Sequence, residues 1–215
     1  GGLLHAPDMY MDKIVVGPAA KGSVHLDAPV EENLSNLAKA LGKEMDDLTV
    51  VILDRERQEE IIQKARKCGA RIRLISDGDV SPAAACALTG NGVDMMLGVG
   101  GAPEGVLAAV AIRCLGGEMQ ARLWPENDED IKRAQALGIQ DVNKLLTMED
   151  LVRDDDVIFV ATGITEGLLL PGVTFTAQGG STHTLLMRGK TGTVRFIEAR
   201  HRFDKKPKYA IKGAY

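Results

Sequence analysis

The chain has 215 residues, so it is long enough to bury a substantial core, because chains of this size cover roughly 70% of their unfolded surface on folding. Its 26 basic and 30 acidic residues give a net charge of −4, which excludes a protein whose whole surface binds nucleic acid or an anionic membrane. No apolar run approaches the roughly 20 residues of a membrane span, and the first residues lack a signal-segment pattern. We therefore expect a soluble, cytoplasmic protein.

The cysteines and histidines give no sign of a disulfide framework or a metal site. The three cysteines are scattered among apolar residues and show no Cys-x-x-Cys spacing, so we expect buried, reduced thiols. The four histidines share no metal-ligand spacing, so we expect them on the surface or in structural hydrogen bonds. These residues are Cys68, Cys86, Cys114, His5, His25, His183 and His201.

The first half of the chain alternates between short apolar runs and amphipathic segments. The apolar run Leu48–Leu53 is rich in β-branched residues, as is typical of a strand covered on both faces. Strands that alternate with helices predict a mostly parallel sheet flanked by helices, with right-handed crossovers. The expected strands are 13–17, 48–53, 71–75 and 93–97, and the expected helices are 31–41, 58–67, 80–88 and 103–115.

The second half is less regular and turns to β structure. We expect helices at 128–137 and 148–152, followed by a buried strand at 157–161. Two apolar segments, 185–188 and 193–197, flank Gly189-Lys190-Thr191-Gly192, which is typical of a hairpin loop. The fold class is therefore α/β, with a β-hairpin-rich C-terminal part.

Polar residues follow three consecutive expected strands. The segments are Asp54–Arg57, Ser76–Asp79 and Gly98–Gly105, which carry in turn two arginines, two carboxylates around a glycine, and a glycine-rich run before a helix. Ligands of open α/β sheets bind outside the carboxyl ends of the strands, so these segments are the candidates for a site.

Each of the first two segments has more than one interpretation. If the backbone is extended at Arg55 and Arg57, both guanidinium groups lie on one side and suit a phosphate or carboxylate; otherwise they are a solvated helix start. Asp77 and Asp79 suit sugar hydroxyls, a divalent cation, or the cap of the following helix.

The glycine-rich segment permits a tight turn and a close approach of a ligand to the backbone at Gly98, Gly100 and Gly101. Glu104 falls in the first turn of the expected helix, where the helix dipole keeps a carboxylate ionised and where it can also hold a hard cation. The segment is not a dinucleotide fingerprint, because the third glycine is out of register and no acidic residue ends a following strand.

Several motifs occur in the order found in one known family. They are residues 5–13 (His-Ala-Pro-Asp-Met-Tyr-Met-Asp-Lys), 77–79 (Asp-Gly-Asp), 100–105 (Gly-Gly-Ala-Pro-Glu-Gly), 117–123, 160–165 and 195–198. In these motifs, which extend over nearly the whole chain, the sequence resembles the class II fructose-1,6-bisphosphatases of bacteria. That family belongs to the lithium-sensitive, metal-dependent sugar phosphatases, and some members also act on sedoheptulose-1,7-bisphosphate.

The resemblance implies a layered α/β sugar-phosphatase fold and hydrolysis of the 1-phosphate of fructose-1,6-bisphosphate in gluconeogenesis, by metal-assisted attack of water on phosphorus. It implies that Glu104 is a ligand of Mn2+ or Mg2+, and it assigns no catalytic residue to this chain. The residues that it implies contact the substrate are Tyr10, Arg55, Glu56, Arg57, Asp77, Gly78, Asp79 and Gly101.

One departure from the family pattern affects the interpretation of the chain. The Asp-Pro-Ile-Glu-Gly-Thr element and further carboxylates of the family's N-terminal part do not occur here. We interpret the chain as the carboxyl-terminal, substrate-binding portion. Residues 1–30 are then a strand segment of the truncated metal-binding domain, 31–165 an α/β substrate-binding domain and 166–215 a β-rich C-terminal segment.

The expected partners are a sugar bisphosphate, the missing N-terminal portion and other copies of the chain, but not nucleic acid or membrane. We expect no useful activity from this chain alone. Two alternatives remain: a Rossmann-type nucleotide-binding domain, and a non-enzymatic half-domain that assembles with a separate N-terminal piece.

Overall fold

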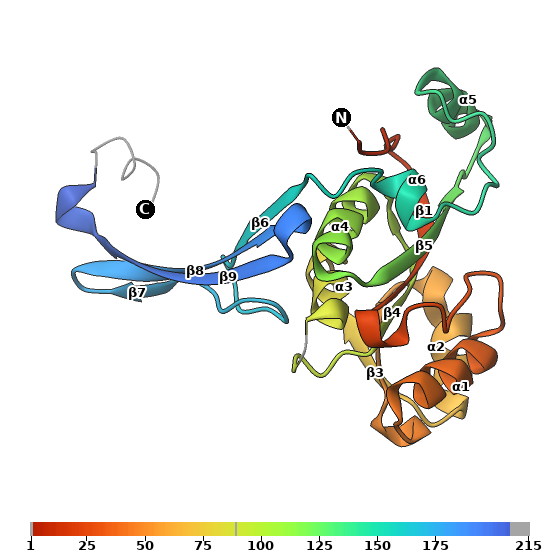
Figure 1. The fold of residues 1–215 in the computed structure, drawn as a ribbon, viewed down its shortest axis with the longest axis horizontal. Coiled ribbons are helices and arrows are strands. Elements are labelled where there is room, and N and C mark those ends of the chain that lie inside the picture. Colours follow the sequence, from red (N-terminus) through yellow and green to blue (C-terminus); the bar gives the residue numbers. More distant parts are fainter. Residues whose placement is uncertain (1, 89, 207–215) are drawn as a thin grey trace.

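The described residues of this computed structural model, 2–88 and 90–206, form two β-sheets (Figure 1). The first has the strand order β3-β2-β4-β1-β5, and in the second β6, β7 and β9 all pair with β8. The strands are β1 (Tyr10–Val16), β2 (Thr49–Leu53), β3 (Arg71–Ile75), β4 (Met95–Gly101), β5 (Glu118–Trp124), β6 (Ile158–Thr162), β7 (Thr174–Thr176), β8 (Gly179–Arg188) and β9 (Thr193–Arg202).

Helices cover both faces of the first sheet. The helices are α1 (Val30–Leu41), α2 (Glu59–Lys67), α3 (Val80–Ala87), α4 (Ala102–Leu115), α5 (Asp128–Ala136) and α6 (Met148–Leu151). Leu34 of α1 and Ile62 of α2 share one core cluster with Ile52, whereas α3 and α4 share another with Val51. Val51 and Ile52 are both fully buried, because successive residues of a strand point to opposite faces. The expected strand covered on both faces is therefore confirmed.

The expected α/β class, with a sheet flanked by helices, is confirmed, and this sheet is mixed because one strand runs opposite to the others. Strand β2 pairs in parallel with β3 and β4, but β1 lies antiparallel between β4 and β5. The amino end of β1 therefore lies beside the carboxyl end of β4, and Tyr10 is opposite Gly101. Strand β5 was not expected from the sequence, although Met119, Ala121 and Leu123 alternate with polar residues and are buried.

The second sheet confirms the expected hairpin, since β8 and β9 pair along their full lengths around residues 189–192. Leu185 and Met187 of β8 are fully buried in the same core cluster as α3 and α4. The expectation that residues 157–161 form a buried strand is wrong for one face of β6, because Ile158 and Val160 are 58% and 56% exposed. Only the face that carries Phe159 packs on the helices.

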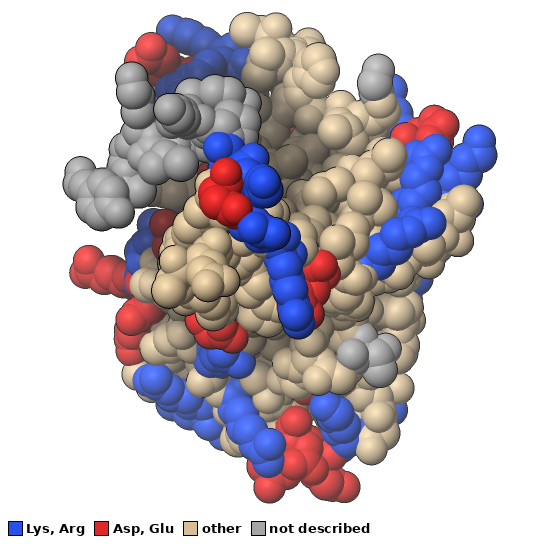
Figure 2. Space-filling model, turned by 90° about the vertical axis from the view of Figure 1, so that its left-hand side faces the viewer, with Lys and Arg blue, Asp and Glu red and all other residues tan. Residues whose placement is uncertain are grey.

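The far end of the second sheet extends beyond the helices (Figure 1). Phe175 of β7 is largely exposed there. Figure 2 views the molecule from this side and shows Lys and Arg side chains beside a wide area without charged groups. The C-terminal residues 207–215 of the expected β-rich segment lie outside the described residues.

The remaining expectations concern cysteines, histidines and membrane spans. Cys86 and Cys114 are buried as expected, Cys68 is half-buried, and all three are free in the described part of the chain. Burial raises the pKa of the Cys86 thiol, which keeps it protonated. His201 bonds Thr182 through its Nε2 atom at 2.9 Å. None of the described helices combines the length and the apolar character needed to cross a membrane.

Two substitutions in α4 test the assignment of its buried face. Ile112→Ala should lower the free energy of unfolding by about 2–5 kcal/mol, because Ile112 is fully buried and its removal leaves a cavity. Leu107→Ala is the matched control, since Leu107 is 53% exposed on the same helix and should change stability much less. Urea denaturation measures both values, and equal losses would contradict the assigned face.

Candidate functional site

The carboxyl ends of β2, β3 and β4 meet the amino end of β1 at one edge of the first sheet. A cavity of about 180 Å³ lies there, lined by Tyr10, Leu53, Arg55, Arg57, Asp77, Gly78, Asp79, Gly100, Gly101 and Glu104. The structure therefore brings together all the expected site residues except Glu56, which is exposed and does not line the cavity. Tyr10 reaches this edge because β1 runs opposite to β4.

The two arginines approach the cavity in different ways. The backbone is extended at Arg55, but a 3-10 turn begins at Glu56, so of the two alternatives the extended one holds at Arg55 and not at Arg57. The Arg57 guanidinium instead lies 4.2 Å above the ring centre of Tyr10, a cation–π contact that holds it over the cavity. Within the described residues neither arginine forms an ion pair, which leaves both charges for an anion.

The two aspartates have different surroundings. Asp77 is exposed, and its Oδ1 accepts a hydrogen bond from the backbone N–H of Gly78 at 2.8 Å. Asp79 precedes helix α3 but makes no capping bond, so the capping interpretation is wrong for it. Its Oδ2 instead accepts a hydrogen bond from Lys13 Nζ at 2.5 Å, inside the protein.

The glycine-rich segment belongs largely to β4, which continues to Gly101, and α4 begins at Ala102, so the strand leads directly into the helix without the expected glycine-rich turn. A Cβ atom on Gly100 would overlap Asp79 Oδ2, and one on Gly101 would overlap Glu104 Oε2. Gly100 is therefore needed for the close approach of the buried Asp79 carboxylate, whereas the exposed Glu104 side chain can move away from a Cβ atom at position 101. The sequence interpretation had assigned that space to a ligand.

Lys13 is the important residue that sequence reasoning missed as part of this site. It is fully buried, and its Nζ donates hydrogen bonds to Asp79 Oδ2 and to the backbone oxygen of Gly101, the latter at 2.8 Å. Burial lowers the pKa of Lys13, and the Asp79 carboxylate opposes this shift. The available signal was its position: Lys13 shares the core-facing side of the strand with Met11 and Val15.

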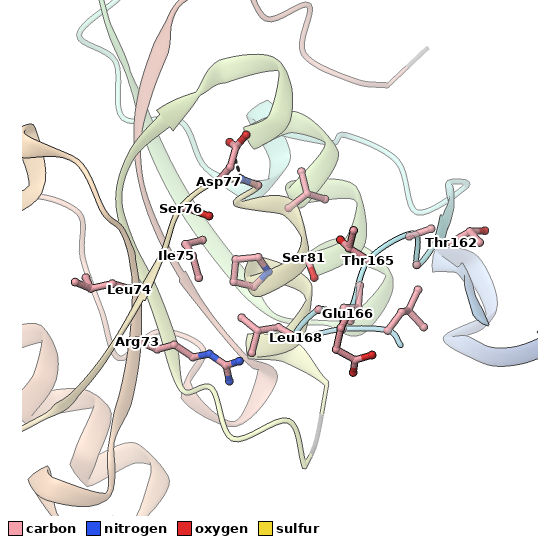
Figure 3. A pocket seen from close by; sticks show the side chains of 18 of the residues that line it. Arg73, Leu74, Ile75, Ser76, Asp77, Ser81, Thr162, Thr165, Glu166 and Leu168 are labelled. Atoms are coloured by element: carbon pink, nitrogen blue, oxygen red, sulfur yellow. Dashed lines mark hydrogen bonds between the residues drawn. The ribbon is translucent and has the colours of Figure 1, made fainter. Parts of the chain in front are cut away.

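A larger cavity of about 730 Å³ adjoins the first and shares Asp77 and Gly78 with it. Strand β3 lines one side and the loop that follows β6 lines the other, as Figure 3 shows for Arg73 and Glu166. We place the candidate site in the smaller cavity, because the two unpaired arginines and the carboxylates converge there.

Comparison with known proteins shows the family to which the chain belongs. Residues 1–201 match the family described as bacterial fructose-1,6-bisphosphatase, glpX-encoded. The chain belongs to this family. It is 47% identical over 214 residues to the fructose-1,6-bisphosphatase class 2 of Haemophilus influenzae, a match that covers 94% of this chain and 64% of that protein. It is 44% identical over 216 residues to a D-fructose 1,6-bisphosphatase class 2/sedoheptulose 1,7-bisphosphatase of Synechococcus sp. (strain JA-3-3Ab), covering 95% and 62%.

The chain therefore spans less than two thirds of the length of these curated relatives. Its sheet also differs from that of a Rossmann domain, whose strands are mostly parallel, because β1 runs antiparallel in the middle of the sheet. Membership of the fructose-1,6-bisphosphatase family and this strand order both disfavour the nucleotide-binding alternative.

The divalent cation implied by the fructose-1,6-bisphosphatase family fits this chain only in part. Glu104 is a hard oxygen donor at the cavity, which suits Mg2+ or Mn2+. However, no group of three or more His, Cys, Asp or Glu side chains able to hold a metal occurs among the described residues. Asp79, the buried carboxylate of the cavity lining, is already bonded to Lys13. The described residues therefore supply one candidate ligand and do not form a complete metal centre.

A substitution at Gly100 tests the packing beneath the cavity. Gly100→Ala should lower the free energy of unfolding by about 1–3 kcal/mol, because the added methyl group displaces the Asp79 carboxylate. Gly167→Ala is the control, since the nearest atom to its added Cβ is 3.7 Å away, and its effect should stay within about 1 kcal/mol. Thermal or urea unfolding measures both, and a neutral Gly100→Ala would show that the site has spare room.

Proposed function

We propose that this chain is the substrate-binding part of a metal-dependent phosphatase that hydrolyses the 1-phosphate of fructose-1,6-bisphosphate. The observation that carries the proposal is the convergence of Arg55, Arg57, Asp77, Asp79 and Glu104 on one cavity, in a chain of this family. The curated relatives are named for activity on fructose 1,6-bisphosphate. We extend that substrate to the protein to which this chain belongs.

In this proposal the arginines bind a phosphate group of the substrate. A guanidinium presents a planar fork of N–H donors that matches phosphate oxygens. Arg55 and Arg57 have no competing carboxylate among the described residues, and the Tyr10 ring supports Arg57 from below. Binding therefore does not require an existing ion pair to be broken.

The aspartates and glycines provide the contacts to the sugar. Asp77 and Asp79 accept hydrogen bonds from hydroxyl groups, and Gly78 and Gly101 leave room for the sugar against the backbone. The cavity of about 180 Å³ is smaller than the roughly 300–1,000 Å³ of most ligand sites. It accommodates one phosphate and the adjoining part of the sugar, and the rest of the substrate extends beyond it.

In the whole protein Glu104 would be one ligand of a Mg2+ or Mn2+ ion, and the remaining ligands would come from the part of the relatives' length that this chain does not match. A divalent ion in such a site neutralises phosphate charge and lowers the pKa of a bound water. The choice between Mn2+ and Mg2+, action on seven-carbon bisphosphates and a homo-oligomeric state belong to the same proposal. We place the protein in the cytoplasm, in gluconeogenesis, where sugar bisphosphates occur.

The uncovered face of β6 is the surface on which we place that further part of the protein. Leu3, Leu107, Ile158 and Val160 are exposed apolar side chains around an open groove of about 500 Å³. Exposed apolar surface of this kind marks a contact with another protein segment. Strand β6 also pairs on one side only, with β8, so within the described residues its other edge is open to a further strand.

Residues 55–57 provide both a test variant and a control variant for phosphate binding. Arg57→Ala should weaken binding of fructose-1,6-bisphosphate by about 2–3 kcal/mol, because a charge-assisted contact is lost. Glu56→Ala should leave affinity nearly unchanged, since Glu56 is exposed outside the cavity. Isothermal titration calorimetry on the 215-residue chain in metal-free buffer measures both, and equal affinities for the two variants would contradict the assignment of Arg57.

A turnover measurement tests whether the 215-residue chain catalyses hydrolysis by itself. The 215-residue chain should release no phosphate at a useful rate from fructose-1,6-bisphosphate with Mn2+, because its described residues form no complete metal centre. A full-length family member is the positive control in the same phosphate-release assay. Turnover by the chain at a comparable rate would show that it holds its own catalytic centre.

A further inference from the structure

Lys13 lies directly beneath the candidate site but is not part of its lining. It occupies the middle of β1, opposite Gly98 of β4 and Ala121 of β5, and its side chain is fully buried. A ligand in the cavity therefore does not touch it. Removing an ammonium group from water costs roughly several kcal/mol even after the protein relaxes. A buried lysine is therefore tolerated only where specific contacts offset this cost.

The contacts of Lys13 join the two helices that border the cavity. Its Nζ donates to Asp79 Oδ2 at 2.5 Å and to the Gly101 oxygen at 2.8 Å. Asp79 immediately precedes α3, and Gly101 immediately precedes α4. One ammonium group thus connects the sheet to the first residues of both helices.

The same contacts orient the Asp79 carboxylate. Lys13 occupies Oδ2, whereas Oδ1 makes no hydrogen bond to the described residues, and Asp79 lines the cavity. Oδ1 is therefore the atom left for a ligand. Gly100 permits this arrangement, because a side chain there would meet both Asp79 Oδ2 and Lys13 Nζ.

Lys13 also changes the charge that a phosphate group meets. The charged residues that line the cavity are two arginines and three carboxylates, namely Arg55, Arg57, Asp77, Asp79 and Glu104. Without a cation below them these groups carry a net negative charge, which repels a phosphate. The buried ammonium at Asp79 brings the net charge of these groups to zero. The two arginines then attract a phosphate without an excess of negative charge around them.

We propose that Lys13 is a positioning residue of the bisphosphate site, which orients Asp79 and the Gly101 backbone and offsets the negative charge of the lining. This inference rests on the proposed function, because it assumes that the cavity binds a sugar phosphate. It adds to that function a residue that acts from inside the core through Asp79.

Calorimetric titration of fructose-1,6-bisphosphate into the 215-residue chain, in metal-free buffer, tests the proposal. Lys13→Met keeps the bulk of the side chain but removes its charge, and should weaken binding about tenfold or more, since Asp79 is left uncompensated. Lys13→Met combined with Asp79→Asn restores the charge balance and should recover most of that loss. Lys64→Met, on the exposed face of α2, is the matched control and should bind as the unaltered chain does.

The outcomes separate a positioning role from a purely structural one. Wild-type affinity in a folded Lys13→Met chain would overturn the proposal, and so would a folded double variant that binds as weakly as the single one. If Lys13→Met does not fold, the double variant is compared with Asp79→Asn alone, so that only Lys13 differs: affinity several-fold weaker in the double variant supports the proposal, and equal affinities refute it.

The same titrations distinguish this inference from the proposed function. If the unaltered chain binds no fructose-1,6-bisphosphate, the proposed function of the cavity fails, and the role of Lys13 fails with it. If the unaltered chain binds and Arg57→Ala weakens binding while Lys13→Met does not, only the role of Lys13 is refuted.

Discussion

The ion pair between Lys13 and Asp79 is the interaction on which the arrangement of this sheet edge depends. Both side chains are withdrawn from water, and each tolerates this only because the other neutralises it and the Gly101 oxygen accepts a further N–H. Loss of one member of such a pair typically costs about 3–5 kcal/mol, because the remaining charge stays buried. The pair links β1 with the starts of α3 and α4, so the position of each depends on the others.

The other features of the cavity surround this pair. Glycine is required at position 100 because the buried carboxylate of Asp79 lies where a Cβ atom would be. The antiparallel direction of β1 places Tyr10 next to Gly101, and the Tyr10 ring then supports Arg57. The buried Lys13–Asp79 pair and the Tyr10–Arg57 contact hold Asp79 and Arg57 in place before any ligand arrives, which reduces the ordering cost of binding.

The chain combines a cavity that gathers the proposed substrate-binding residues with an incomplete set of metal ligands among the described residues. Its arginines and aspartates converge on one cavity, whereas no group of three or more side chains able to hold a metal occurs among the described residues. The second sheet meanwhile leaves Ile158 and Val160 exposed on a strand with an open edge. Both observations agree with a chain that spans less than two thirds of its curated relatives.

The sequence by itself determined the local elements and the grouping of the polar segments. Residues 48–53 read as a buried strand because their apolar run is continuous, and the rule for open α/β sheets placed Arg55, Asp77 and Glu104 at one edge. Only the tertiary structure decided three features: the direction of β1, the exposed face of β6 and the partner of Asp79. Each of these depends on segments distant in the chain: Lys13 and Asp79 are 66 positions apart, and no local pattern encodes which buried charge will meet which.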